Sequence, residues 1–155
     1  MLKYFLAGTL LAFGVVPAAA ADWYFIDMSN RFTSITFVDK DSIRARGTVS
    51  EGTVYMVFPD SGDGAAAIES RMEIDCATPR SRIVHLRAFD EAEAVQFDDS
   101  VEGEWDVVRN ESQAGRVREF ICSGGTNRPA EASRGSAHPF AFGRQTLREQ
   151  GRGLQ

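Results

Sequence analysis

Two histidines and a run of acids are the side chains of this sequence that could take part in acid–base chemistry. A small hydrolase or lyase could use His85 as a general base together with acids from the 90–106 stretch. The other histidine, His138, lies in the segment after residue 123. The sequence contains no nucleophile elbow, glycine-rich phosphate loop or paired-histidine metal motif. We therefore predict a non-enzymatic protein with no catalytic residue, keep the hydrolase or lyase as the alternative, and interpret His85 as a solvated or hydrogen-bonded side chain.

The acids between residues 90 and 106 form the strongest charge feature of the chain. This stretch has no base and contains eight acids, namely Asp90, Glu91, Glu93, Asp98, Asp99, Glu102, Glu104 and Asp106. Such a run is usually a solvated loop, and the functional alternatives are a weak divalent-cation site or a patch for a basic partner. Residues 39–42 (Asp-Lys-Asp-Ser) lack the glycine and the distant glutamate of a calcium loop, so we expect a strand-ending turn there. We predict no bound metal and no cofactor.

The first 21 residues have the pattern of a secretory signal peptide. Lys3 precedes an apolar or small run over residues 4–16, and alanines occupy positions 18–21 before Asp22. The run has 13 residues, whereas a helix that spans a bilayer needs about 20. No cysteine follows the run to carry a lipid. We expect cleavage before Asp22 and export, either to the periplasm or as a secreted protein, with no stable membrane anchor afterwards.

The two cysteines, Cys76 and Cys122, both lie in the exported part of the chain. An oxidising compartment allows thiols to pair, and two cysteines allow one pairing. Because the two positions are 46 residues apart, closing this loop removes unfolded-state entropy worth about 4 kcal/mol. We predict a structural disulfide between Cys76 and Cys122. Two buried free thiols, or a zinc site shared with His85, are the alternatives.

Alternation of apolar and polar residues predicts that the mature chain is mainly β. We expect strands at 23–26, 34–38, 53–58, 68–76 and 82–89, with shorter extended pieces at 93–98 and 104–108. Residues 53–58 are apolar at every second position on both faces, which indicates a central strand covered on both sides. In residues 68–76 apolar side chains alternate with charged ones, so Cys76 is expected to face the core.

A helix is expected over residues 111–122, after the strands. Asn110 is the expected N-cap with Gln113 as its capping-box partner, and glycines at 124 and 125 are the expected stop. Ala114, Val117, Ile121 and Cys122 share one stripe of this helix. The disulfide would therefore join a core-facing strand position to a core-facing helix position. The fold class predicted is α+β, mainly β, with about six antiparallel strands and one C-terminal helix docked on the sheet by the disulfide.

The composition changes after residue 123, where Gly, Ser, Ala, Arg and Pro dominate. We expect a signal peptide over 1–21, a β-sheet domain over 22–125 and a basic, mostly disordered tail over 126–155. Residues 138–142 and 145–150 are the candidates for local order in that tail. The net charge of the whole chain is −5, which argues against general nucleic-acid binding.

Several segments match a known pattern when they are read together. They are Trp23, Phe37-Val38-Asp39 with Ser42-Ile43, Glu73-Ile74-Asp75-Cys76 followed by Arg80 and Arg82, Trp105, and Phe120-Ile121-Cys122 at the end of the expected helix. From Trp23 to Cys122 the chain resembles the bacterial surface-adhesin protein E family. The resemblance implies an antiparallel sheet of about six strands, a terminal helix tethered by the disulfide, and no active site. It also implies binding of host extracellular proteins at the bacterial surface.

Three features depart from the family pattern. The chain lacks the amino-terminal cysteine that carries the lipid of the adhesin members, Phe58 stands where many relatives have Trp, and the hairpin from Arg87 to Val95 lacks an expected glycine. A soluble periplasmic or secreted module is therefore expected at least as much as one associated with the cell surface. We predict that it holds a protein or peptide partner, of unknown identity, on a face or edge of its sheet.

Overall fold

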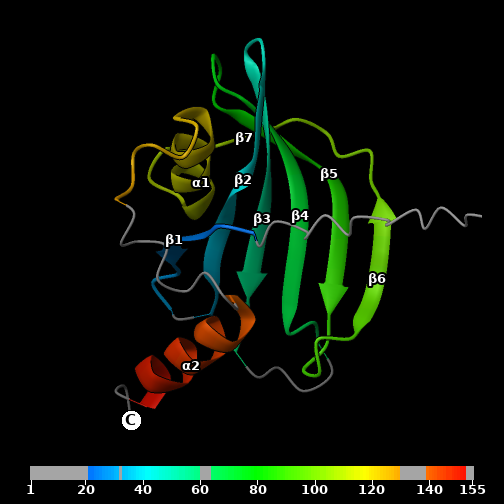
Figure 1. The fold of residues 1–155 in the computed structure, drawn as a ribbon, viewed down its shortest axis with the longest axis vertical. Coiled ribbons are helices and arrows are strands. Elements are labelled where there is room, and N and C mark those ends of the chain that lie inside the picture. Colours follow the sequence, from blue (N-terminus) through cyan, green and yellow to red (C-terminus); the bar gives the residue numbers. More distant parts are fainter. Residues whose placement is uncertain (1–20, 32, 60–63, 130–138, 153–155) are drawn as a thin grey trace, which may run out of the picture.

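The computed structural model describes residues 21–31, 33–59, 64–129 and 139–152. Its centre is one antiparallel sheet in the order β1-β2-β3-β4-β5-β6, and a short β7 pairs with β5 (Figure 1). The strands are β1 (Trp23–Met28), β2 (Ile35–Arg46), β3 (Val49–Val57), β4 (Ala67–Asp75), β5 (Arg80–Phe89), β6 (Val95–Ser100) and β7 (Asp106–Val107), and the helices are α1 (Gln113–Cys122) and α2 (Pro139–Arg152). The prediction of a mainly β fold with about six antiparallel strands and a helix joined to them by the Cys76–Cys122 disulfide is confirmed.

Two apolar clusters lie on opposite faces of this sheet. Neighbouring residues of a strand point to opposite faces, and Phe37 and Val38 of β2 accordingly belong to different clusters. The cluster on what we name the α1 face contains Tyr24, Ile26, Val38, Val54, Ile74, Val117, Phe120 and Ile121. The cluster on the α2 face contains Ile35, Phe37, Tyr55, Val57, Ala66, Ala67, Phe140 and Leu147. The sheet is thus a middle layer, with one helix on each face.

The strand-ending turn expected at residues 39–42 is absent, because β2 continues through them to Arg46 with an irregular register. The polar groups of this segment are satisfied locally. The Asp39 carboxylate accepts hydrogen bonds from the backbone N–H groups of Asp22 and Asp41, and burial raises its pKa against the lowering effect of these bonds. The Ser42 hydroxyl donates to the Asp39 carbonyl at 2.6 Å and accepts from Thr53 N–H at 2.7 Å. A bulge can therefore replace a turn without orphaned backbone groups.

Helix α1 begins two residues later than expected, and its N-cap is Ser112 rather than Asn110. The Ser112 hydroxyl accepts a hydrogen bond from Gly115 N–H at 3.1 Å, as an N-cap does. The expected stripe is right for Val117 and Ile121 and wrong for Ala114, which is exposed. Gly115 and Phe120 are buried instead. The buried face is therefore rotated toward Phe120.

Gly115 is required by a close approach of the backbone at the start of α1. A Cβ at this position would overlap the carbonyl oxygens of Asn110 and Arg109. We expect Gly115→Ala to destabilise the protein by about 1–3 kcal/mol through overpacking, although alanine is the better helix former by about 1 kcal/mol. Urea unfolding measures the change. Ala114→Gly, at the exposed neighbour, should lose only the helix propensity of about 1 kcal/mol, and a Gly115→Ala chain as stable as the original would contradict the close approach.

Helix α2 corrects the expectation of a mostly disordered tail for residues 139–152, which form a helix and pack against the sheet. The two candidates for local order, residues 138–142 and 145–150, overlap this helix. Phe140 and Leu147 are 9% and 4% exposed. They lie seven residues apart, two turns of helix, and so on one side of α2. Two apolar anchors in a segment rich in Gly, Arg and Gln give little local signal, and the surface that buries them comes from distant strands. His138 lies outside the described residues, and no helix of the described part is long and apolar enough to cross a bilayer.

Candidate binding surface

His85 lies on β5 within a cross-strand ladder of charges. Its Nε2 is 3.1 Å from Asp98 Oδ1 of β6, and Asp98 also accepts from Arg87 Nε at 2.9 Å. Arg87 reaches Glu69 of β4 at 3.4 Å. Residues paired across strands place these groups in rows on the α2 face, beyond the part that α2 covers. This arrangement matches the interpretation of His85 as a hydrogen-bonded side chain of the sheet.

The acids of the 90–106 stretch do not converge on one point. The Asp90 carboxylate closes the β5–β6 turn by accepting from the backbone of Ala92 and Ala94, each at 2.9 Å. Glu91 pairs with Arg144 of α2 at 2.6 Å, and Asp98 pairs with His85 and Arg87. The remaining acids follow the β6 edge and the connection to β7. Within the described ranges no group of three or more His, Cys, Asp or Glu side chains is placed to hold a metal ion.

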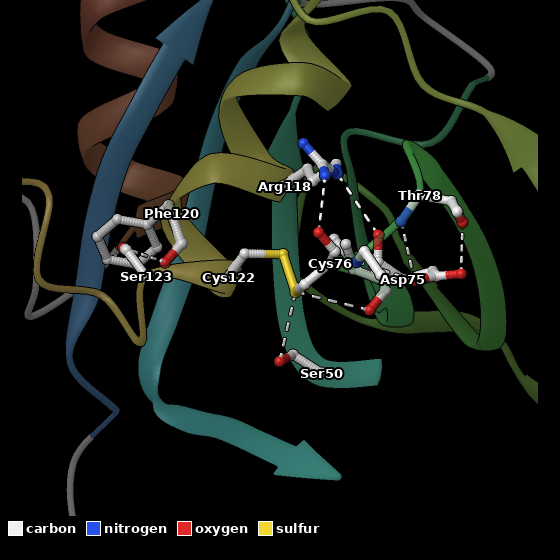
Figure 2. The surroundings of a disulfide bond; sticks show 10 residues. Ser50, Asp75, Cys76, Thr78, Arg118, Phe120, Cys122 and Ser123 are labelled. Atoms are coloured by element: carbon white, nitrogen blue, oxygen red, sulfur yellow. Dashed lines mark hydrogen bonds between the residues drawn. A yellow bond between two sulfur atoms is a disulfide. The ribbon is translucent and has the colours of Figure 1, made fainter. Parts of the chain in front are cut away.

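The disulfide ties the end of β4 to the end of α1, and polar contacts surround it (Figure 2). The two Cα atoms are 5.6 Å apart. Arg118 of α1 donates from Nη2 to the Cys76 carbonyl at 3.0 Å. The Asp75 carboxylate accepts from the Thr78 hydroxyl, from Thr78 N–H at 3.1 Å and from Arg80 Nη2 at 3.0 Å. These donors, with Thr78 first, hold the pKa of Asp75 well below its usual range.

The depressed pKa of Asp75 predicts how the stability of the fold depends on pH. A carboxylate whose folded pKa lies below its unfolded value of about 3.9 stabilises the fold above that value and loses this contribution as the pH falls. We expect Asp75→Asn to be less stable than the original chain at pH 7, with the difference shrinking below about pH 4. Thermal unfolding between pH 7 and pH 2 measures this. An Asp106→Asn control should leave the profile unchanged, and a constant difference across the range would contradict the role of Asp75.

Two arginines of β5 lie over an aromatic ring on the α2 face. Arg80 and Arg82 stand 5.6 Å and 4.9 Å from the centroid of Trp105. Arg82 also pairs with Glu73 of β4 at 2.6 Å. Their charges are therefore engaged, and this cluster fastens the segment before β7 onto β5 rather than presenting free cations.

Strand β6 forms the open edge of the sheet. Figure 1 shows it on the side away from both helices. All six of its residues are exposed, including the apolar Val95 at 52% and Phe97 at 43%. The opposite edge strand, β1, is partly covered, since Arg128 donates to the Ile26 carbonyl at 3.3 Å and Arg116 pairs with Asp27 at 3.2 Å. Among the residues that the structure describes, none shields the backbone groups of the β6 edge in this way.

An apolar hollow lies where β3 ends and β4 begins. It has a volume of about 380 Å³ and is lined by Thr33, Phe58, Pro59, Ala65 and Ile68. Two other hollows are lined by residues around Lys40 and Arg44 and by the segment before α1. None of these three hollows in the described part of the chain is lined by His85 or by residues 90–106.

The sequence predicted the acidic stretch and an extended piece within it, but not that this piece is an edge strand of the sheet. The alternation in residues 93–98 indicated extended structure, and the bulge at Gln96 then places Val95 and Phe97 opposite Phe89 and Ala88. The left-handed backbone of Glu93 (φ 59°) stands in the hairpin where a glycine was expected. Edge position depends on which strands pair, so only the order of the strands could reveal it.

Comparisons with known proteins identify the family of this chain. The family model of surface-adhesin protein E matches residues 23–123. Two crystal structures of Haemophilus influenzae protein E are similar at 12% sequence identity. One covers 70% of this chain and 89% of its own with a TM-score of 0.47, and the other covers 75% and 97% with a TM-score of 0.46. No curated protein matches this chain. The chain therefore belongs to the surface-adhesin protein E family.

Proposed function

We propose that this protein is an exported, non-enzymatic module that binds an extended segment of a protein partner at the β6 edge. The observation that carries the proposal is the exposed edge strand, which leaves one row of backbone donors and acceptors for an added strand. Val95 and Phe97 lie on opposite faces of β6 and supply apolar contact on either side of such a strand. Family membership supports a binding role at the cell surface.

The charge around β6 favours a basic partner. Asp99, Glu102 and Glu104 lie on β6 and the connection that follows it, and none of the three forms an ion pair with another described residue. An arriving strand with Arg or Lys side chains would meet uncompensated negative charge. A second copy of β6 would instead bring the acids of both edges together, and like charges across strands are destabilising. The favoured ligand is therefore an extended, basic segment of another protein.

The pattern of the first 21 residues and the single disulfide support export. We place the protein in the periplasm, in the medium or at the cell surface, where its partner is an exported or host protein. No catalytic residue, cofactor or metal forms part of the proposal.

The experiment is selection of displayed random dodecapeptides on the chain that begins at Asp22, followed by affinity measurements on the selected peptides. We expect extended sequences with alternating Arg or Lys, and affinities that fall as the salt concentration rises. Val95→Lys on β6 should weaken binding at least tenfold, because it adds positive charge and a blocking side chain at the edge. Val107→Lys is the matched control, since Val107 is an exposed valine of another strand.

Two results would contradict the proposal at different levels. Selected peptides that bind Val95→Lys as tightly as the original chain would move the site away from β6. Methylation of alternate backbone nitrogens in a selected peptide should abolish its binding, and binding that survives this change would rule out strand addition.

A further inference from the structure

Helix α2 packs on the α2 face with the spacing of a recognition helix, and we name the surface of the sheet that it covers (Phe37, Tyr55, Val57, Ala66 and Ala67) the α2 groove. Phe140, Gly143, Arg144 and Leu147 are buried, and these positions correspond to i, i+3, i+4 and i+7 of one helix face. A Cβ on Gly143 would lie 2.9 Å from Val57 Cβ. The backbone of α2 therefore lies directly on β3, and the close approach selects a glycine at this point of the helix.

A buried charge orients α2 in this groove. Arg144 is only 6% exposed, and its Nη1 donates to the Phe58 carbonyl at 2.7 Å. Its Nη2 donates to Glu91 in the β5–β6 hairpin at 2.6 Å. A buried charge is tolerated when it is paired and hydrogen-bonded, and it makes the fit specific. Phe140 and Leu147 lie on either side of the paired Arg144 along α2, so the helix fits the sheet in one register.

The groove and its occupant come from different parts of the chain. The floor consists of Phe37, Tyr55, Val57, Ala66 and Ala67, all within residues 23–123 matched by the family. Helix α2 lies beyond residue 123. Unlike α1, which the disulfide holds, α2 has no disulfide to the sheet, because the two cysteines of the chain are both used in the α1 bridge. Helix α2 is therefore held on the sheet by side-chain contacts and by the polypeptide that connects it to α1, which we name the tether.

We infer that the aromatic groove of the α2 face is a second binding site, specific for an amphipathic helix of the pattern Phe-x-x-Gly-Arg-x-x-Leu, and that α2 is its tethered occupant. A partner helix of this pattern binds when α2 leaves. Because the tether keeps α2 at a high effective concentration, α2 competes strongly with any helix in trans. The groove is separate from the β6 edge, so the site does not rest on the function proposed there.

The test uses the chain from Asp22 to Gln155 and a fluorescent peptide with the sequence of residues 137–153. Arg144→Glu in the chain places a carboxylate beside Glu91 and removes the donor to the Phe58 carbonyl, so α2 should leave the groove. Hydrogen exchange of the α2 amides should become fast. The peptide should then bind this variant at least tenfold more tightly than it binds the original chain, as measured by fluorescence anisotropy.

Two controls make the result specific. Gln150→Glu, at an exposed position of α2, should change neither exchange nor peptide binding, and a peptide with Gly143→Leu should bind at least tenfold more weakly than the original peptide. Gly143→Leu in the chain is a second way to release α2. Release of α2 by either variant without gain of peptide binding would overturn the inference, and so would α2 amides that stay protected in both variants.

Discussion

Replacement of both cysteines by alanine is expected to lower the free energy of unfolding by about 2–5 kcal/mol. The bridge joins positions 46 residues apart, and the loop-closure estimate for that length is about 4 kcal/mol. It also fixes α1, whose Val117, Phe120 and Ile121 complete the cluster on the α1 face. A loss of this size is a large fraction of the stability of a small domain.

Chemical denaturation of the original chain and of the double variant measures this loss. The original chain in reducing agent should unfold at the same denaturant concentration as the double variant, since both lack the bridge. Reducing agent should leave the double variant unchanged. Equal midpoints for the oxidised original chain and the double variant would show that the bridge contributes nothing to stability.

Phe120→Ala is expected to destabilise the protein by about 3–5 kcal/mol. Phe120 has no exposed surface, and its ring centroid lies 5.2 Å from that of Tyr24 on β1. Truncation removes the buried ring and leaves a cavity between α1 and the sheet, so the lost transfer energy and the cavity add. Because the disulfide still holds the end of α1, the helix should remain near the sheet while its packing loosens.

Denaturant unfolding of Phe120→Ala, with near-ultraviolet circular dichroism for the Tyr24 environment, checks this expectation. Glu119→Ala is the matched control, because Glu119 is the exposed neighbour on the same helix and surface substitutions usually change stability by less than about 0.5 kcal/mol. A similar loss in the two variants would mean that α1 docks by some contact other than the Phe120 ring.

The strands illustrate what a local pattern can and cannot predict. Alternation located β4 within one residue at each end, because one face of that strand is apolar and the other charged. The polar segment at 39–42 predicted a turn, and the structure continues β2 through it. The difference arises because Ser42 satisfies the backbone of Thr53 on the neighbouring strand. Such a contact needs the partner strand in place.

The two candidate binding surfaces also depend on contacts that a local sequence pattern cannot predict. The acidic stretch was evident from composition, but its position on the open edge follows from β6 being last in the strand order. The α2 groove gave no signal at all in the sequence of the strands. Its floor alternates with residues of the α1 face, and its occupant is a segment whose composition is typical of disorder.

The sequence by itself determined the mainly β class, the cysteine pairing, a C-terminal helix near residues 111–122 and the family. These follow from periodicity, from the presence of only two cysteines and from residue types at fixed spacing, all of which are local or countable. Only the tertiary structure decided which strand edge stays open, why Gly115 and Gly143 must be glycines, and that residues 139–152 fold. Those outcomes depend on surfaces formed by residues far apart in the chain, whose burial offsets the entropy of ordering a segment that has little intrinsic preference.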